Sequence, residues 1–327
     1  MEIKSLFLIG NGFDLWQNLP TSYKAFREYY EKNKDRIGKE LKIDNVTVSG
    51  RDGTLAMNYF EMLYWFFSWD TMGMGVLSQQ GNCYGKDYKL PQTPIPAEFW
   101  SDFENYLYDL DVDYILDGFR EHNKIDFDLM FDDFVDLKLL LTEYLYQWIN
   151  SVDIPYIQSE YNFKNCFFVN FNYTYTLRQR FGVNGALDYH IHGFCNNKAS
   201  LCFGHTKEIE ELEEYYEVEA IDIIKGYLQS IYKNPKQKIK QLKKYTHKNN
   251  INLSNIDTIY VLGHSFGMVD FEYFKFIAET FPNVKWKISY HSENDIVKIR
   301  SVLLKLGITN YELNKNIADL IEPFKLT

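Results

Sequence analysis

The chain has 327 residues, of which 46% are hydrophobic and 24% are charged, and its formal net charge is −10. This composition is typical of a globular protein with a sizeable core, and it excludes a broad basic surface, so direct binding of nucleic acid is not expected. The apolar run near the start is too short for a signal peptide and no window approaches about eighteen uninterrupted apolar residues, so we expect a cytoplasmic protein without a membrane segment.

The N-terminal half is predicted to be helical after one buried strand at Ser5–Ile9. Residues 71–96 are rich in Gly, Gln and Pro and form a predicted long loop. Loops of that length are uncommon unless they act as lids or binding segments. Apolar spacing predicts helices at about 23–34, 55–69, 96–122 and 127–150.

The C-terminal half alternates strands with helices. A highly charged stretch at 208–248 is expected to form a pair of solvated helices. Strands are predicted at 166–171, 256–262, 284–290 and 309–313, and further helices at 270–280 and 293–306. Alternation at both ends of the chain predicts a parallel α/β sheet, with the helical middle as a cap or insertion.

The cysteines give little support to a metal site. None belongs to a C-x-x-C pair, and they stand at Cys83, Cys166, Cys195 and Cys202. Cys195 and Cys202 could share a metal ion with His190, His192 or His205, but structural zinc sites use tighter spacings. We therefore expect reduced thiols and no metal.

Glycines follow the first predicted strand. In an open α/β sheet, ligands bind at the carboxyl ends of the strands. Gly10-Asn11-Gly12 would let the backbone turn tightly and approach a phosphate closely. Position 15 is leucine, so the third glycine of the G-x-G-x-x-G motif is missing. The alternative is a tight turn, with Thr21 or Ser22 capping the next helix.

Amides and histidines follow two further strands. Asn172 could bond a ligand or a water, although Asn172 or Thr174 could equally be a helix N-cap. His190 and His192 are two residues apart, which places them on the same side of a strand. His192 directly precedes a glycine at a predicted strand end, so it is the better catalytic candidate.

The string Gly263-His264-Ser265-Phe266-Gly267 fits G-x-S-x-G, the nucleophile elbow of α/β-hydrolases. A serine hydrolase using Ser265 would need an acid and then a histidine downstream. Asp270 follows the elbow too closely for a triad, and His291 precedes Asp295, which reverses the expected order. The hydrolase is therefore only an alternative.

Taken together, the loop motifs resemble a known series. The segments "GNGFDLWQNLPTSY", "FNYTYTL", "HIHG" and "GHSFGMVD", with "FWSDFE" at 99–104, resemble the AbiH family of bacterial abortive-infection proteins. The motifs run from near the N-terminus to about residue 275, so the resemblance covers most of the chain. It implies a role as an effector of defence against phage.

The same series resembles, more distantly, the sirtuin-like NAD-binding domains. Their motifs G-A-G-[IF]-S, N-[IY]-D, H-G and G-T-S-L match, in order, residues 10–14, 172–174, 192–193 and 263–266. Asn11 replaces alanine, Asp14 replaces serine, and Thr174 replaces the acid of the second motif. The cysteine pairs of the sirtuin zinc ribbon are missing, which favours the NAD-hydrolysing branch over protein deacetylation.

The resemblance implies a Rossmann-like, sirtuin-like parallel sheet in a single domain over residues 1–327, with largely helical insertions at about 55–150 and 206–250. It also implies an NAD⁺ glycohydrolase, with NAD⁺ as substrate. His192 would be the general base, Asn172 would orient water or the ribose, and Asp14 would stabilise a cation-like transition state or cap a helix. The implied nucleotide-binding residues are Gly10, Asn11, Gly12, Phe13, Ser22, Gly263, His264 and Ser265.

Other functions stay open at this point. The protein could be a nucleotide-binding sensor without turnover, an enzyme acting on another nucleotide, or the serine hydrolase described above. In the favoured interpretation the G-x-S-x-G match is accidental, and Ser265 contacts ribose or phosphate. A phage-derived activator and a homo-oligomer are further expectations.

Overall fold

A computed structural model describes residues 2–41, 46–50, 53–57, 127–206, 225–226 and 228–326. The chain divides into two compact units. We call the first the β-sheet unit, which comprises residues 1–25, 145–206 and 233–327. The second, the insertion unit, comprises 26–144 and 207–232.

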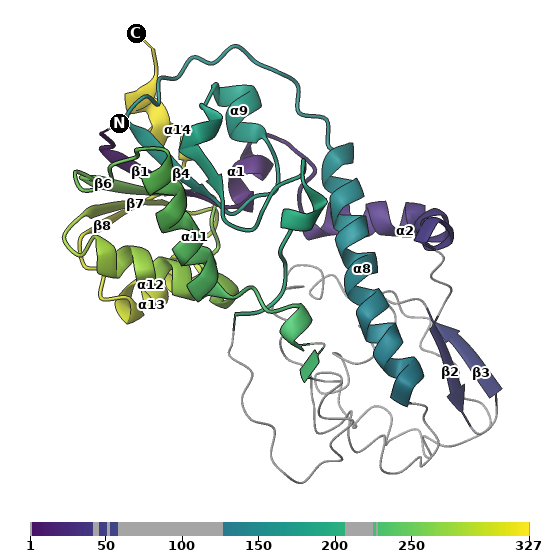
Figure 1. The fold of residues 1–327 in the computed structure, drawn as a ribbon. Helices are drawn as coiled ribbons and strands as arrows, with labels where there is room; N and C mark the ends of the chain where they lie inside the picture. The colour runs from purple at the N-terminus through teal and green to yellow at the C-terminus, as the bar shows by residue number, and fades with distance from the viewer. Residues whose placement is uncertain are drawn as a thin grey trace, which may run out of the picture. The chain divides into compact units, whose positions relative to one another are not determined.

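The β-sheet unit is built on six parallel strands in the order β5-β4-β1-β6-β7-β8 (Figure 1). All residues of β1 and β4 are buried, as expected for parallel strands covered on both faces. In chain order this arrangement is 3-2-1-4-5-6, the strand order of dinucleotide-binding α/β folds. The strands are β1 (Ser5–Ile9), β4 (Cys166–Asn170), β5 (Asp188–His190), β6 (Thr258–Leu262), β7 (Lys285–Ser289) and β8 (Tyr311–Asn314).

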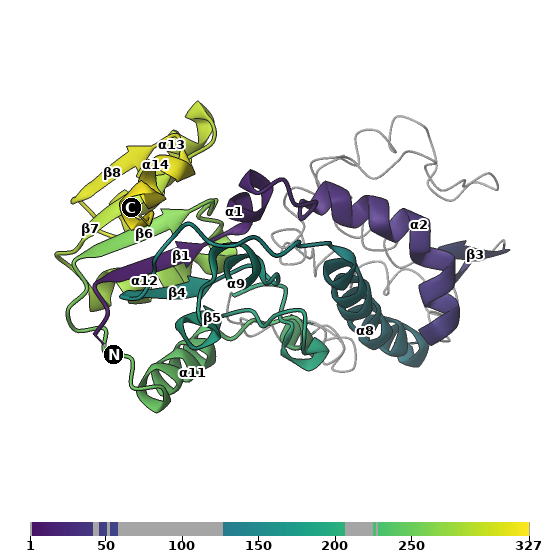
Figure 2. The ribbon, with the colours of Figure 1, turned by 90° about the horizontal axis from the view of Figure 1, so that it is seen from above.

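Helices cover both faces of this sheet (Figures 1 and 2). On one face lie α1 (Asn11–Trp16) and α9 (Thr176–Phe181), and on the other lie α12 (Phe271–Thr280) and α13 (Glu293–Lys305). The rings of Phe13 in α1 and Phe181 in α9 lie 5.2 Å apart between centroids and join the core. The connections are completed by α11 (Pro235–Lys248) before β6 and α14 (Ile317–Ile321) after β8.

The insertion unit includes most of two long helices and a hairpin. The helices are α2 (Tyr23–Leu41) and α8 (Phe127–Ser151), and both extend into the first unit. The hairpin strands β2 (Val46–Gly50) and β3 (Gly53–Met57) pair antiparallel. Tyr30 and Tyr144 make an edge-to-face contact at 5.0 Å between ring centroids.

The predicted α/β class and parallel sheet are confirmed, and strand and helix boundaries in the C-terminal half agree within about three residues. The helix predicted from Leu55 is wrong at its start, because residues 55–57 lie in β3, where the β-branched strand 46–48 supplies a pairing partner. The predicted loop at 71–96, the helix at 96–122 and residues 207–224 lie outside the described residues.

The insertions expected at 55–150 and 206–250 overlap the insertion unit, but α11 belongs to the β-sheet unit. Among the residues that the structure describes, no helix is long and apolar enough to cross a membrane.

Candidate active site at the strand ends

The carboxyl ends of four strands lie in one row. Ile9 at the end of β1 pairs with Asn170 of β4 on one side and with Leu262 of β6 on the other. Asn170 in turn pairs with His190, the last residue of β5. The loops that follow these strands therefore begin side by side, so the fold brings together the four motifs that the sequence singled out.

The glycines of the first and fourth loops allow these loops to touch. The Gly12 amide donates to the Gly263 carbonyl at 2.7 Å, and the Gly10 amide donates to Leu262 at 3.0 Å. A Cβ atom on Gly12 would lie 2.8 Å from the Gly263 oxygen. Gly263 itself has a φ of +64°, and its Cβ would lie 2.1 Å from the Phe13 nitrogen. Close packing of two loops thus accounts for these glycines.

Other residues of the first loop have structural partners. The Asn11 side chain donates to the Thr21 carbonyl at 2.8 Å. Ser22 Oγ accepts from the Ala25 amide at 3.1 Å and so caps α2. Phe13 is buried in the core, so its ring is not free to pack on a ligand at the surface.

A buried acid joins the first loop to the second. Thr174 Oγ1 donates to Asp14 Oδ2 at 2.6 Å, and Asp14 is only 1% exposed. Burial raises the pKa of Asp14 from 3.8 to about 6, although hydrogen bonds from Thr174 and Thr176 oppose the rise. Asp14 Oδ1 is buried and has no hydrogen-bond partner among the described residues. An unpaired carboxylate oxygen in such a place can accept a hydroxyl of a ligand or hold a proton.

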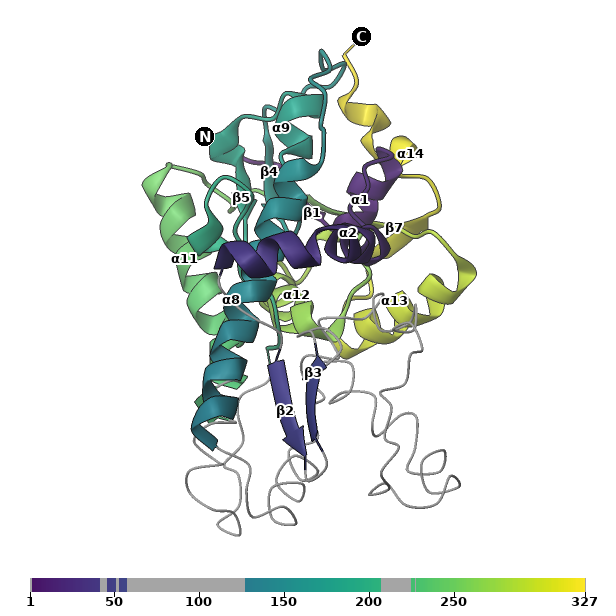
Figure 3. The same ribbon diagram turned by 90° about the vertical axis from the view of Figure 1, so that its right-hand side faces the viewer.

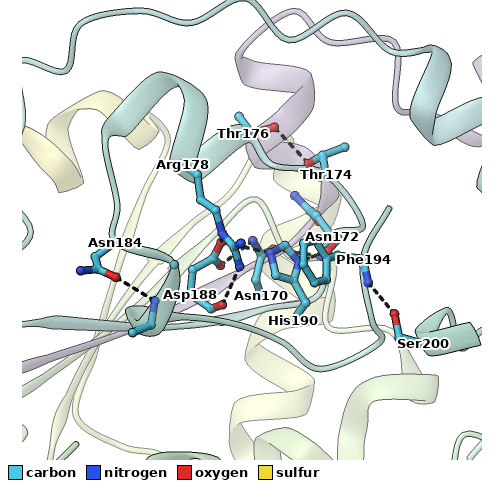
Figure 4. Close-up of polar contacts among 12 residues, drawn as sticks. Asn170, Asn172, Thr174, Thr176, Arg178, Asn184, Asp188, His190, Phe194 and Ser200 are labelled. Atoms are coloured by element: carbon cyan, nitrogen blue, oxygen red, sulfur yellow. Dashed lines mark hydrogen bonds and ion pairs between the residues drawn. The ribbon is translucent and has the colours of Figure 1, made fainter. Parts of the chain in front are cut away.

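Asn172 is held at three points (Figure 4). Its amide donates to Asn170 Oδ1 at 3.0 Å, and its carbonyl lies 2.8 Å from His190 Nδ1. Its side chain donates to the Gly10 carbonyl at 3.1 Å, which ties the second loop to the first. The nearby side chain of Asn172 also lowers the pKa of Asp14. Asn172 therefore sits at the junction of both loops, beside the buried acid.

A network behind Asn172 fixes this loop, and sequence reasoning missed it (Figure 4). Asp188 accepts from Arg178 Nε at 2.9 Å and from Asn170 Nδ2 at 3.1 Å, and it lies 3.0 Å from His190 Nε2. Burial alone would raise the pKa of Asp188, but His190 and Arg178 lower it. Both His190 ring nitrogens lie within hydrogen-bond distance of oxygen atoms, one of Asn172 and one of Asp188, so the ring is held in place from both sides. Its position supports structure rather than chemistry.

His192 faces a second buried acid. Its Nε2 lies 2.9 Å from Asp270 Oδ1, and His264 Nε2 lies 3.3 Å from Asp270 Oδ2. His264 Nδ1 accepts from the Phe266 amide at 2.9 Å, which fixes the tautomer with the proton on Nε2. Lys233, only 1% exposed, has its Nζ 4.0 Å from Asp270.

The second ring nitrogen of His192 carries a lone pair. Burial and, to a smaller extent, the charge of Lys233 lower the pKa of His192 from 6.5 to about 4, although Asp270 opposes this shift. The Nε2 proton is donated to Asp270, so Nδ1 of the neutral ring is unprotonated. Nδ1 is buried without a hydrogen-bond partner among the described residues. This arrangement is that of a histidine general base oriented by a carboxylate.

The comparison with known families decides the identity of the chain. The family described as "Bacteriophage abortive infection AbiH" matches residues 6–290. The chain belongs to the AbiH family. No curated protein and no solved structure matched, so the sirtuin-like resemblance stays a prediction. Membership assigns the protein to bacteriophage abortive infection, and the matched span includes all four AbiH loops described above.

The geometry does not favour Ser265 as a nucleophile in this AbiH protein. Ser265 is exposed, and it makes no hydrogen bond to a histidine that the structure describes. Asp270 follows the elbow too closely for a triad with Ser265, and its carboxylate instead contacts His192 and His264. Its role was missed because a hydrogen bond between residues 192 and 270 leaves no local pattern in the sequence.

The cysteines of the AbiH chain that the structure describes are free thiols at Cys166, Cys195 and Cys202. Burial raises the pKa of Cys166 to about 12, so this thiol is unreactive. Within the described ranges, no group of three or more His, Cys, Asp or Glu side chains is arranged to hold a metal ion. Cys83 lies outside them.

Proposed function

We propose that this AbiH protein hydrolyses the bond between nicotinamide and ribose in NAD⁺, releasing nicotinamide and ADP-ribose. The observation that carries the proposal is the His192–Asp270 pair, in which one ring nitrogen is held at 2.9 Å by a carboxylate and the other keeps a buried lone pair. Such a nitrogen is suited to take a proton from water.

The proposed reaction needs few groups. Water oxygen bonds to the anomeric carbon of the ribose as the bond to nicotinamide breaks, and nicotinamide leaves as a neutral molecule with the bonding electron pair. The water proton passes to His192 Nδ1, and Asp270 balances the new positive charge. Asn172 positions the ribose or the water, and the ionised Asp14 carboxylate, through its unpaired Oδ1, stabilises the cation-like transition state.

The diphosphate requires contacts other than those first expected. The amides of Gly10, Gly12 and Phe13 already donate to backbone carbonyls, so they are not available to an anion without breaking those bonds. We therefore assign the nucleotide to the exposed surface of the loops, with Asn11 and Ser265 as exposed members and Ser22, Gly263 and His264 beside them.

The direct test is to incubate purified protein with NAD⁺ and to measure nicotinamide and ADP-ribose by chromatography. His192→Gln and Asn172→Ala should remove turnover while the melting temperature shows that each variant folds. The matched control is His291→Gln, which changes an exposed histidine outside the site. NAD⁺ cleavage that persists in His192→Gln at the parental rate would exclude the proposed base.

A nucleotide sensor without turnover is the second candidate function. The low basicity of His192, whose pKa is about 4, favours it, because a weak base extracts protons poorly at neutral pH. Thermal stabilisation by NAD⁺ with no nicotinamide released would support this function over hydrolysis. The proposal includes a phage-derived activator and self-association, so the assay is repeated with lysate from infected cells.

A further inference from the structure

Helix α11 concentrates positive charge in a chain of net charge −10. Its 14 residues include no acidic side chain, and four of its lysines, all exposed, recur at intervals of four residues. Four-residue steps keep these lysines on one side of the helix, in a row about 18 Å long at 1.5 Å per residue. We call this row the lysine stripe: Lys236, Lys240, Lys244 and Lys248.

The apolar side of α11 is already covered by the β-sheet unit. Leu242 is buried in the core, and Ile239 packs against it. The Tyr245 ring lies 4.9 Å from that of Tyr189 in β5, and its hydroxyl donates to the Gly185 carbonyl at 3.2 Å. Figures 2 and 3 show α11 beside the β5 edge of the sheet. The lysine stripe therefore occupies the side of the helix that is left to solvent.

Folding does not explain the lysine stripe. Like charges four residues apart oppose helix formation, and the stripe contains three such pairs. Lys236 lies in the first turn, where the helix dipole disfavours a cation. Lys240, Lys244 and Lys248 make no ion pair with any residue in the described part of the chain.

The net charge argued against nucleic-acid binding through a broad basic surface, but a narrow row of lysines does not need one. We propose that the lysine stripe binds the phosphodiester backbone of nucleic acid. Lysines act as point charges on phosphates, and the exposed amides of Gln237 and Gln241 beside the stripe can donate to phosphate oxygens. A protein partner is disfavoured because protein interfaces are depleted in lysine and use aromatic or apolar anchors, which the stripe lacks. A membrane-surface helix would need a free apolar face.

This surface adjoins the candidate active site but shares no residue with it. Asn234 caps α11, with its Oδ1 accepting from the Gln237 amide at 3.0 Å, and it directly follows Lys233 beside Asp270. The charge of Lys238 on the same helix also lowers the pKa of His192. Binding at the stripe can be measured whether or not the protein cleaves NAD⁺, so the two proposals fail separately.

The test is fluorescence anisotropy of the full chain with a labelled single-stranded RNA and a labelled DNA duplex at several NaCl concentrations. Phosphate contacts of Lys240, Lys244 and Lys248 predict a slope of log affinity against log salt of about −2 to −3. The variant Lys240→Glu/Lys244→Glu/Lys248→Glu should weaken binding at least about tenfold and flatten this slope by about 2 to 3.

A triple variant of the same charge change is the control. Lys298→Glu/Arg300→Glu/Lys305→Glu reverses three exposed cations on α13, so equal weakening by both variants would show only a net-charge effect and overturn the proposal. Absence of binding to both probes at low salt would overturn it too. So would binding of polyglutamate or phosphatidylserine vesicles without binding of RNA or DNA. Tighter binding of one probe would show whether the lysine stripe prefers the single-stranded RNA or the DNA duplex, and either preference supports the proposal.

Discussion

Thr174 donates a hydrogen bond of 2.6 Å to Asp14, and this bond joins the loops that follow β1 and β4. Both residues are departures from the sirtuin-like motifs, which carry a serine at the position of Asp14 and an acid at that of Thr174. The two departures face each other. In this chain the acid stands in the loop after β1 and the hydroxyl in the loop after β4, so that one buried hydrogen bond ties the two loops together.

The buried pair of Asp14 and Thr174 predicts a reciprocal rescue. Asp14→Ser alone leaves Thr174 without its acceptor, and Thr174→Asp alone places two carboxylates side by side in a buried site. The double variant Asp14→Ser/Thr174→Asp restores one hydroxyl and one carboxylate. We expect its unfolding free energy to exceed the additive value by about 1–3 kcal/mol in urea denaturation. Additivity within about 0.5 kcal/mol would mean that the two residues do not act as a pair.

A second prediction concerns the pH dependence of stability. The pKa of Asp14 is raised from 3.8 to about 6, so the folded protein binds this proton more tightly than the unfolded chain. The resulting stabilisation is fully present below pH 3.8 and is lost as the pH rises through about 6. This rise in pKa corresponds to about 3 kcal/mol of stability for the buried Asp14 carboxyl.

Asp14→Asn removes this titration, so the stability of the variant relative to the parent should increase by about 2–2.5 kcal/mol between pH 4 and 7.5. Thermal or urea unfolding at both pH values measures the difference. Asp257→Asn, at an exposed carboxylate, controls for loss of one charge. If the stability difference between Asp14→Asn and the parent stayed constant across this pH range, Asp14 would not have a raised pKa in the folded protein. A stabilised but inactive Asp14→Asn would mark a residue kept for function.

Alanine substitutions at three glycines distinguish the stability lost through a steric clash between loops from that lost through a left-handed backbone conformation. Gly307→Ala, where φ is +69° and no atom lies within 4 Å of a new Cβ, should cost only the left-handed conformation, about 1 kcal/mol. Gly263→Ala adds a clash with the Phe13 nitrogen and should cost at least about twice as much. Gly12→Ala meets the Gly263 carbonyl at 2.8 Å, so it should lower the melting temperature. Normal melting with lost nucleotide affinity would instead restore the phosphate-cradle interpretation of Gly12.

The sequence predicted the strands and the convergence of their loops because apolar runs and glycine turns are local signals. It could not predict which side chains form hydrogen bonds with each other across distant parts of the chain. His192 and Asp270 are separated by 78 residues, and Asp14 and Thr174 by 160. The same limit applied to Gly12, whose local pattern is equally that of a phosphate loop and of a loop packed on Gly263. The start of β3 was missed because pairing with β2, not its own apolar spacing, determines its conformation.

The last prediction tests Asp270 as the residue that positions His192. Asp270→Asn should lower kcat for NAD⁺ cleavage by about 10²–10⁴-fold with a smaller change in KM, because an amide is a poor partner for the imidazolium formed in the transition state.

Loss of the Asp270 carboxylate should also lower the pKa of His192 below its parental value of about 4, since Asp270 opposes the effects of burial and Lys233. NMR titration of the ring carbons, assigned with His192→Gln, follows this shift without requiring turnover. The stability arising from the depressed pKa of His192 is present above pH 6.5 and is lost as the pH falls through about 4. A parental His192 that titrates near 6.5 would contradict the effect of burial and Lys233 on its pKa, and full activity in Asp270→Asn would contradict the assignment of this pair as the base.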